Sequence, residues 1–311
     1  MRWYQHQYHT PSTLKLVFLT IPQLPKLCHP PIAAVTALIF FLLLGSERRA
    51  VISNLRHIRR PGKRHLWWKA YKLFYSFCDF VVSYCYVPRA DHSQLLAMLT
   101  DPDRGAEKID NCLQLGKGLI VWTAHLGNWE FASRLLEMHG TKVNVARLVE
   151  RDKPAEVMLR DMMTNERLNI VELNEGVPGS IKLLEALRNN EIVAIQGDRF
   201  YRGYHAAVPF FGKPVMFPLG PFLLSHLAGA PILPGFVVRE KWLRYKVIMG
   251  EPIYVQETED RELYSLSAAR QAVAFLEDNV RTYDDQWLNF FDFWAAQGAS
   301  DRGDRNRIDH G

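Results

Sequence analysis

The second part of the chain alternates between short apolar runs and segments of helical period, and this order constrains the fold more than any other feature. The run Gly118–Thr123 is apolar and short, which is typical of a buried strand, and residues 131–138 then read as a helix that Gly140 ends. The same order recurs in strands at 143–148, 170–173, 192–196, 232–239 and 243–249 and helices at 154–165, 178–189, 218–228, 262–281 and 286–294. The sequence therefore predicts an α/β fold with a mixed, largely parallel sheet flanked by helices.

Length and composition fit one large domain that follows an apolar N-terminal segment. The 311 residues are 48% hydrophobic and include 17 Phe, which is enough for a sizeable core and excludes a disordered chain. We expect a membrane-associating segment at 1–48, a folded α/β domain at 49–296 and a polar tail at 297–311.

The apolar N-terminal run Ile32–Leu44 carries no charge but is shorter than the roughly 20 residues that span a bilayer. A cleavable signal peptide is not expected, because no small-x-small cleavage site follows the run. Three interpretations remain: a tilted or partly inserted anchor, a hairpin with residues 14–28, or a buried helix. The basic residues that follow, beginning with Arg48 and Arg49, favour an anchor whose basic end stays in the cytoplasm.

The net charge of +5 and the isoelectric point near 9.0 indicate acidic partners. Phospholipid head groups, phosphorylated substrates, an acidic carrier protein and nucleic acid all qualify. The basic residues cluster just after the apolar run, which suits an anionic membrane surface. No nucleic-acid-binding motif is present, so no nucleic-acid partner is expected.

The four cysteines indicate neither a metal site nor a disulfide framework. They show no C-x-x-C and no zinc spacing, which favours a reducing compartment. Cys78 and Cys85 lie seven residues apart within an aromatic-rich segment, 71–86, that reads as a helix at the membrane interface or in the core, and we expect both to be buried thiols. No metal and no cofactor is predicted.

A histidine and a carboxylate five residues apart, His125 and Glu130, follow the first predicted strand. They can meet if His125 lies in the turn and Glu130 in the first helical turn, with Asn128 as the N-cap. Glu130 would then orient the imidazole of a general base. With 11 His and 33 acidic residues, about one such pair is expected by chance, so His125 bonded to a loop carbonyl and an exposed Glu130 is the alternative.

Three further segments could take part in binding or catalysis. Asp198 and Arg199 follow the strand 192–196 directly and so emerge at the sheet edge where α/β proteins bind ligands. Arg199 could hold a phosphate, or the two residues could form a pair that stabilises a turn. Arg147 lies near the end of another predicted strand and is either a second phosphate contact or a surface arginine. The apolar segment 208–214 is expected to form a loop that either lines a pocket for an apolar chain or merely packs.

In their order and spacing, these segments resemble the bacterial lysophospholipid acyltransferase superfamily, most closely the lipid A late acyltransferases, the lauroyl and myristoyl transferases. The resemblance covers roughly residues 30–295 and rests on the following segments: Arg49 with Ser53-Asn54-Leu55, Thr123-Ala124-His125-Leu126-Gly127-Asn128-Trp129-Glu130, Ala146-Arg147, Gln196-Gly197-Asp198-Arg199, Pro209-Phe210-Phe211-Gly212-Lys213-Pro214, Gly229-Ala230-Pro231-Ile232-Leu233-Pro234 and Gln286-Trp287.

This resemblance implies a glycerol-3-phosphate acyltransferase-like fold at the cytoplasmic face of the inner membrane of a Gram-negative bacterium. It implies transfer of a fatty acyl group from an acyl-carrier-protein or CoA thioester to a hydroxyl of a lipid acceptor. His125 would be the general base and Glu130 its partner, with backbone N–H groups near Asn128 stabilising the oxyanion. Arg147, Asp198 and Arg199 would contact substrate phosphates. Direct attack fits the absence of a Ser or Cys nucleophile beside His125.

The chain departs from the family pattern at Gly197-Asp198-Arg199, where Asp-Gln-Asp is usual, and at Leu148-Val149. The acceptor therefore stays open among lipid A precursors, mannolipids, ornithine-type lipids and specialised aryl-polyene or glycolipid products. Two other functions are possible: a thioesterase that uses His125 to activate water, and a non-catalytic membrane adaptor.

Overall fold

A six-stranded sheet forms the centre of the protein in a computed structural model, which describes residues 11–58, 63–102, 105–148, 154–173, 177–199, 203–255 and 260–296. The predicted polar tail 297–311 lies outside the described residues. The strand order is β3-β2-β4-β1-β7-β8, all parallel except for the antiparallel pair β7–β8, so the predicted α/β fold is confirmed. The strands are β1 (Leu119–Thr123), β2 (Val143–Arg147), β3 (Leu168–Glu172), β4 (Ile192–Gln196), β7 (Ile232–Lys241) and β8 (Arg244–Met249).

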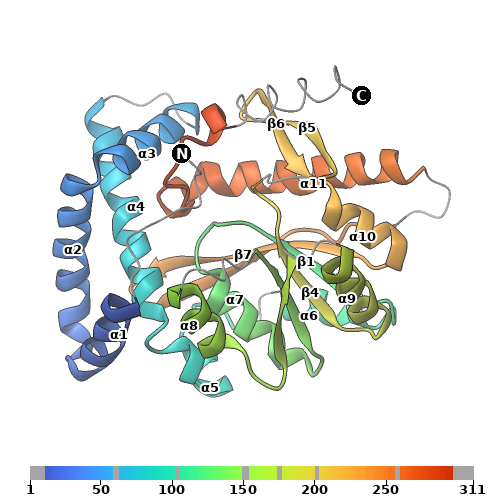
Figure 1. Cartoon of the computed structure of the whole chain (residues 1–311), viewed down its shortest axis with the longest axis horizontal. Helices are drawn as coiled ribbons and strands as arrows, with labels where there is room; N and C mark the ends of the chain where they lie inside the picture. Colours follow the sequence, from blue (N-terminus) through green and yellow to red (C-terminus); the bar gives the residue numbers. More distant parts are fainter. Residues whose placement is uncertain are drawn as a thin grey trace.

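Helices cover both faces of this sheet (Figure 1). Alternate β1 side chains point to opposite faces: Val121 packs with Ile109 and Leu136, whereas Trp122 packs in the main core with α9, α10 and α11. Burial on both faces explains why β1 is apolar throughout. The covering helices are α5 (His92–Ala97), α6 (Ala106–Leu113), α7 (Trp129–Leu136), α8 (Pro154–Met163), α9 (Val177–Arg188), α10 (Gly220–Ala228) and α11 (Arg261–Thr282).

Four N-terminal helices pack at one end of the sheet, where α2 forms the outer layer against α4 (Figure 1). Helix α4 is tied to the sheet by Asp79, whose carboxylate accepts a hydrogen bond from Tyr245 of β8 and lies 3.8 Å from Arg239 of β7. Burial raises the pKa of Asp79 to about 6. The helices are α1 (Pro11–Thr20), α2 (His29–Leu43), α3 (Gly45–Ile58) and α4 (Lys63–Ser83), with short 3₁₀ turns at Ile21–Gln23 and Lys26–Cys28.

Helix α2 buries one stripe and exposes the rest. His29, Ala33, Ala37 and Phe41, spaced four apart, are buried. Its other large apolar side chains are exposed: Ile32, Val35, Leu38, Ile39, Phe40, Leu42 and Leu43. Within the described residues, one segment, Lys26–Leu43, is long and apolar enough to cross a membrane, by length and composition only. The exposed apolar face excludes the interpretation of α2 as a helix buried on all sides.

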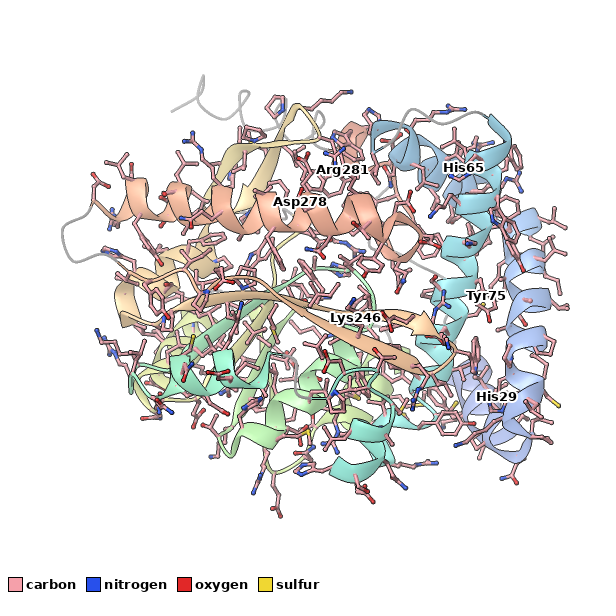
Figure 2. The ribbon with its side chains drawn as sticks, turned by 180° about the vertical axis from the view of Figure 1, so that it is seen from behind. His29, His65, Tyr75, Lys246, Asp278 and Arg281 are labelled. Carbon is pink, nitrogen blue, oxygen red and sulfur yellow. The ribbon has the colours of Figure 1, made fainter. Side chains whose placement is uncertain are left out.

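Two predictions at the C-terminal side were wrong. Residues 208–214, expected to form a loop, belong to the antiparallel hairpin β5 (His205–Phe210) and β6 (Lys213–Pro218). The hairpin turn packs on α11, where Arg281 (labelled in Figure 2) lies over the ring of Phe211 at 5.0 Å. Residues 286–294 were expected to be helical, but a 3₁₀ turn at Asp284–Gln286 is followed by irregular chain, and helix begins only at residue 293. The backbone of this segment bonds to the turn after β1 and not within a helix, since the Leu288 N–H donates to His125 O.

Candidate active site

The imidazole of His125 is paired with Asp198, at the ends of two neighbouring strands. The β1–β4 register sets Thr123 opposite Gln196, so the residues two positions further along, His125 and Asp198, emerge at the same level. His125 Nδ1 lies 2.7 Å from Asp198 Oδ1, and the His125 backbone N–H donates to the same oxygen at 3.2 Å. Asp198 is fully buried, so the structure places it behind the imidazole and not at the surface as a phosphate contact.

The second oxygen of Asp198 is held by the C-terminal segment. Trp287 Nε1 donates to Oδ2 at 3.0 Å, and Asn289 Nδ2 lies 3.5 Å from it. A carboxylate with this many donors has a fixed orientation, and it fixes the imidazole in turn. Trp287 and Asn289 were not predicted as site residues, because nothing local in the sequence shows that this segment returns to the sheet edge.

Glu130 does not orient His125, contrary to the prediction from their spacing. It lies in the first turn of α7, as expected, but its Oε1 accepts a hydrogen bond from Tyr84 O–H at 2.6 Å and lies 3.4 Å from Arg147 Nη1. The physical reason is the sheet register: Asp198 already occupies the position next to His125 Nδ1. Glu130 is left to hold Arg147 at the end of β2.

Asn128 is the N-cap of α7, as predicted, and its Oδ1 accepts the Phe131 N–H at 3.0 Å. Its own backbone N–H donates to Val237 O at 2.7 Å, so that N–H is occupied. Gly127 permits this close approach, because it adopts a φ of +73° and a Cβ there would lie 2.0 Å from Val237 O. Among the described residues, the N–H groups of Trp129 and Glu130 have no acceptor.

Burial and charge keep the imidazole neutral. Burial, followed by the positive charge of Arg199, lowers the pKa of His125 to about 4, although Asp198 acts in the opposite direction. For Asp198, burial favours the neutral acid, but His125 and the hydrogen bonds from His125 and Trp287 outweigh it and hold the pKa below its usual value. At neutral pH the site therefore contains a carboxylate and a neutral imidazole, which can accept a proton.

The two predicted arginine contacts have different surroundings. Arg199 donates from Nε to Asn289 Oδ1 at 2.8 Å and from Nη2 to Leu288 O at 3.0 Å. The structure therefore uses much of its guanidinium to hold the C-terminal segment beside Asp198. Arg147 is partly exposed and lines the cavity described next.

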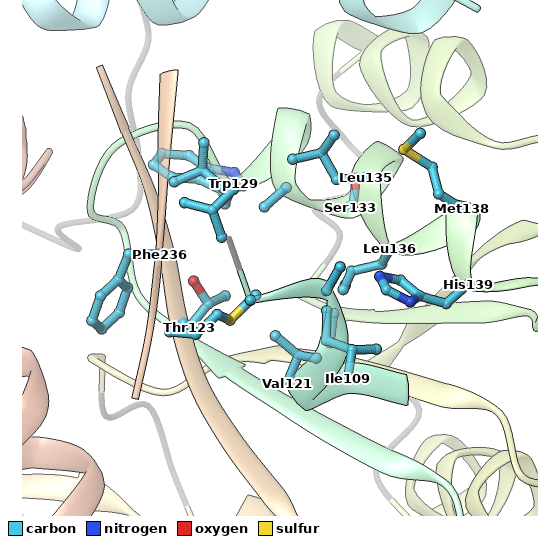
Figure 3. A pocket seen from close by; sticks show the side chains of 18 of the residues that line it. Ile109, Val121, Thr123, Trp129, Ser133, Leu135, Leu136, Met138, His139 and Phe236 are labelled. Carbon is cyan, nitrogen blue, oxygen red and sulfur yellow. The ribbon is translucent and has the colours of Figure 1, made fainter. Parts of the chain in front are cut away.

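An apolar cavity of about 620 Å³ lies between the sheet and helices α5, α6 and α7. Figure 3 shows Thr123, Trp129 and Phe236 around one part of it and Met138 and His139 around another. Glu130 and Arg147 are among its few charged lining groups. The cavity adjoins the pair, because the Trp129 ring meets the His125 ring edge-on at 5.1 Å. Residues 208–214, which were predicted either to line a pocket or only to pack, do not line this cavity.

No group of His, Cys, Asp and Glu among the described residues could hold a metal ion. The arrangement is a buried acid–base pair beside an apolar cavity, with two backbone donors at a helix start. Sites of this kind bind a largely apolar ligand and orient it with few polar groups. They are suited to proton abstraction beside a polarised carbonyl.

Comparison with known proteins places the chain among lipid acyltransferases. A phosphatidylinositol mannoside acyltransferase of Mycobacterium tuberculosis (strain ATCC 25618 / H37Rv) is 33% identical over 152 residues, which are 48% of this chain and 47% of that protein, so the match spans about half of its length. One from Mycolicibacterium smegmatis is 26% identical over 221 residues, 70% of this chain and 69% of that protein. The family model for bacterial lipid A biosynthesis acyltransferases matches residues 70–295, which include the whole candidate site, and the chain belongs to that family.

Proposed function

We propose that this protein transfers a fatty acyl group from a thioester donor to a hydroxyl of a glycosylated, phosphate-bearing lipid at a membrane surface. The observation that carries the proposal is the His125–Asp198 pair beside the apolar cavity, in a chain of this family. The donor's acyl chain fills the cavity, and its thioester lies beside Trp129. The acceptor hydroxyl approaches His125 from the solvent side.

His125 is the general base in this mechanism. Asp198 accepts the Nδ1–H, so Nε2 is the free basic nitrogen. Nε2 takes the proton of the acceptor hydroxyl while the hydroxyl oxygen attacks the thioester carbonyl carbon. The carbon–sulfur bond breaks, and the imidazolium returns the proton to the departing thiolate. Asp198 stabilises the transient imidazolium.

The oxyanion that forms during the attack needs hydrogen-bond donors. The N–H groups of Trp129 and Glu130 supply them in this proposal, because they begin α7 and have no acceptor in the described part of the chain. The positive end of the helix dipole favours negative charge at the same place. Asn128 contributes by capping the helix, not through its own N–H.

The acceptor class follows from the family and from the names of the relatives. Lipid A precursors and phosphatidylinositol mannosides share sugar hydroxyls and phosphate on a lipid. The donor is an acyl-carrier-protein or acyl-CoA thioester, and both carry the acyl chain on a phosphopantetheine thiol. The net charge of +5 suits either acidic donor and an anionic membrane.

The proposed location is the cytoplasmic face of the inner membrane, reached through α2. This helix is about 22 Å long, shorter than a hydrocarbon core of about 30 Å, and one stripe of it stays packed on α4. An interfacial position lets the exposed side chains enter one leaflet while the buried stripe keeps its contacts. The exposed Trp67 and Trp68 of α4 suit head-group depth.

A transfer assay tests the function. Detergent-solubilised protein is given radiolabelled acyl-CoA or acyl-carrier-protein, with lipid A precursors and phosphatidylinositol mannosides as separate acceptors. We expect label to enter one acceptor class and His125→Ala to abolish the transfer. Label found only in free fatty acid would instead support a thioesterase, and vesicle binding without use of any donor would support an adaptor.

A further inference from the structure

The end of helix α4 holds the start of helix α7 through two side-chain hydrogen bonds. Ser83 Oγ accepts from Asn128 Nδ2 at 2.9 Å, and Tyr84 O–H donates to Glu130 Oε1 at 2.6 Å. All four residues are buried. Because a buried polar group that loses its partner is costly, the Ser83 bond holds the N-cap of α7 and the Tyr84 bond holds the Glu130 carboxylate. The N-terminal helices thus reach into the candidate site.

The oxygen that Tyr84 contacts is the one nearest Arg147. Glu130 Oε1 accepts the Tyr84 hydrogen bond and lies 3.4 Å from Arg147 Nη1. Burial, together with the charge of Glu130, raises the pKa of Tyr84 well above its usual value, so the phenol remains a donor. A carboxylate free to rotate would hold the Arg147 guanidinium in several positions. The hydrogen bond from Tyr84 fixes one orientation of the Glu130 carboxylate, and therefore one position of the guanidinium.

The ring of Tyr84 has a separate role from its hydroxyl. It meets the ring of Phe80 edge-on at 5.5 Å, and Phe80 packs on Trp129 at 4.3 Å. These contacts need only an aromatic ring. A Phe at position 84 would therefore keep the packing that leads to Trp129 and remove only the hydroxyl, with its bond to Glu130 and its interaction with Arg147.

We propose that Tyr84 is a positioning residue for acceptor binding: through Glu130 it holds the Arg147 guanidinium where it receives the phosphate of the lipid acceptor. The inference rests on the proposed function, which makes the acceptor a phosphate-bearing lipid. Arginine suits that task because its planar fork matches phosphate oxygens. Arg147 lies at the carboxyl end of β2, the edge of the sheet from which His125 and Asp198 also emerge.

The kinetic test uses Tyr84→Phe with phosphatidylinositol mannoside in detergent micelles as the acceptor. We expect its KM to rise about tenfold, the loss typical of a hydrogen bond to a charged group, while kcat stays within about twofold. The acid side of the pH profile, which reports His125, stays in place. In an Arg147→Ala background, Tyr84→Phe adds nothing further. Tyr264→Phe removes a buried phenol bonded to Ser225 on the other side of the sheet and serves as the matched control.

A binding test separates this inference from the proposed function. The affinity of the His125→Ala variant for the same micellar lipid is measured by tryptophan fluorescence, with and without Tyr84→Phe. A tenfold weakening of binding would support the positioning role. If the protein with His125 intact also transferred no acyl group to this lipid, the positioning role would stand and the proposed function would fail. Unchanged affinity, or no binding in either protein, contradicts the positioning role. In the kinetic test, an unchanged acceptor KM in Tyr84→Phe also contradicts the positioning role. A fall in kcat together with a shift of the acid side of the pH profile contradicts it as well.

A second variant covers the case in which Tyr84→Phe unfolds more readily than Tyr264→Phe. Glu130→Gln keeps the shape of the side chain and its acceptor oxygen but removes the charge that holds Arg147. We expect the same rise in acceptor KM from this variant. An acceptor KM equal to that of the wild type would overturn the proposal.

Discussion

His125 depends on a carboxylate 73 positions away, and that dependence can be tested by a change of one functional group. In Asp198→Asn the amide has nearly the shape of the carboxylate but cannot stabilise an imidazolium or fix the same tautomer. We expect kcat to fall about 10²- to 10⁴-fold with little loss of stability. Steady-state transfer assays measure kcat of this variant, and Asp278→Asn, on the exposed side of α11, is the control. An activity close to that of the wild type would contradict the pairing.

The pH dependence of kcat/KM reports the same residue. The base must be neutral, so activity is lost when His125 takes a proton, as pH falls through its pKa. Burial and Arg199 lower that pKa from 6.5 to about 4. We therefore expect kcat/KM to stay level from pH 8 down to about pH 5 and to decline below it. Half-loss of activity near pH 6.5 would show instead that His125 titrates as an ordinary exposed histidine.

At the scale of the element, α2 exposes one apolar face that nothing described in the chain covers. Val35 and Leu42 lie seven residues apart on this face and are 59% and 62% exposed. We expect Val35→Glu with Leu42→Glu to abolish flotation with anionic vesicles while the unfolding temperature stays nearly constant, because exposed side chains contribute little to stability. Leu263→Glu, at an exposed leucine of α11, is the matched control. Unchanged flotation would contradict the interfacial role of α2.

At the scale of the whole molecule, the cavity between the sheet and the helices should set which acyl chains are accepted. Ile109 of α6 points into it (Figure 3). Ile109→Phe reduces the space, so we expect kcat/KM to fall about tenfold or more for the longest donor used and to change little for a donor a few methylenes shorter. Ile109→Val keeps the shape of the side chain and is the control. An equal loss for both donors would contradict the assignment of the cavity to the acyl chain.

The sequence by itself determined most strands of the central sheet and the strand-to-helix turn that holds His125. Burial on both faces makes β1 apolar throughout, and a polar residue that caps a helix leaves a local signal, so the run 118–123, Asn128 and the turn position of His125 were all readable. The hairpin β5–β6 could not be predicted, because it is held by packing on α11 and on three aromatic residues, Trp287, Phe293 and Trp294. Residues 286–294 looked helical, but the backbone of Gln286 and Leu288 bonds to Gly127 and His125 instead.

Only the tertiary structure decided which residue serves His125. The spacing favoured Glu130, five positions along, because separation along the chain is the only measure of proximity that a sequence provides. Strand pairing brings Asp198 to the same level instead, and Trp287 and Asn289 reach it from the C-terminal segment. Contacts between residues far apart in the chain are set by sheet register and packing, which no local pattern encodes. The same holds for Tyr84, whose bond to Glu130 joins the N-terminal helices to the site.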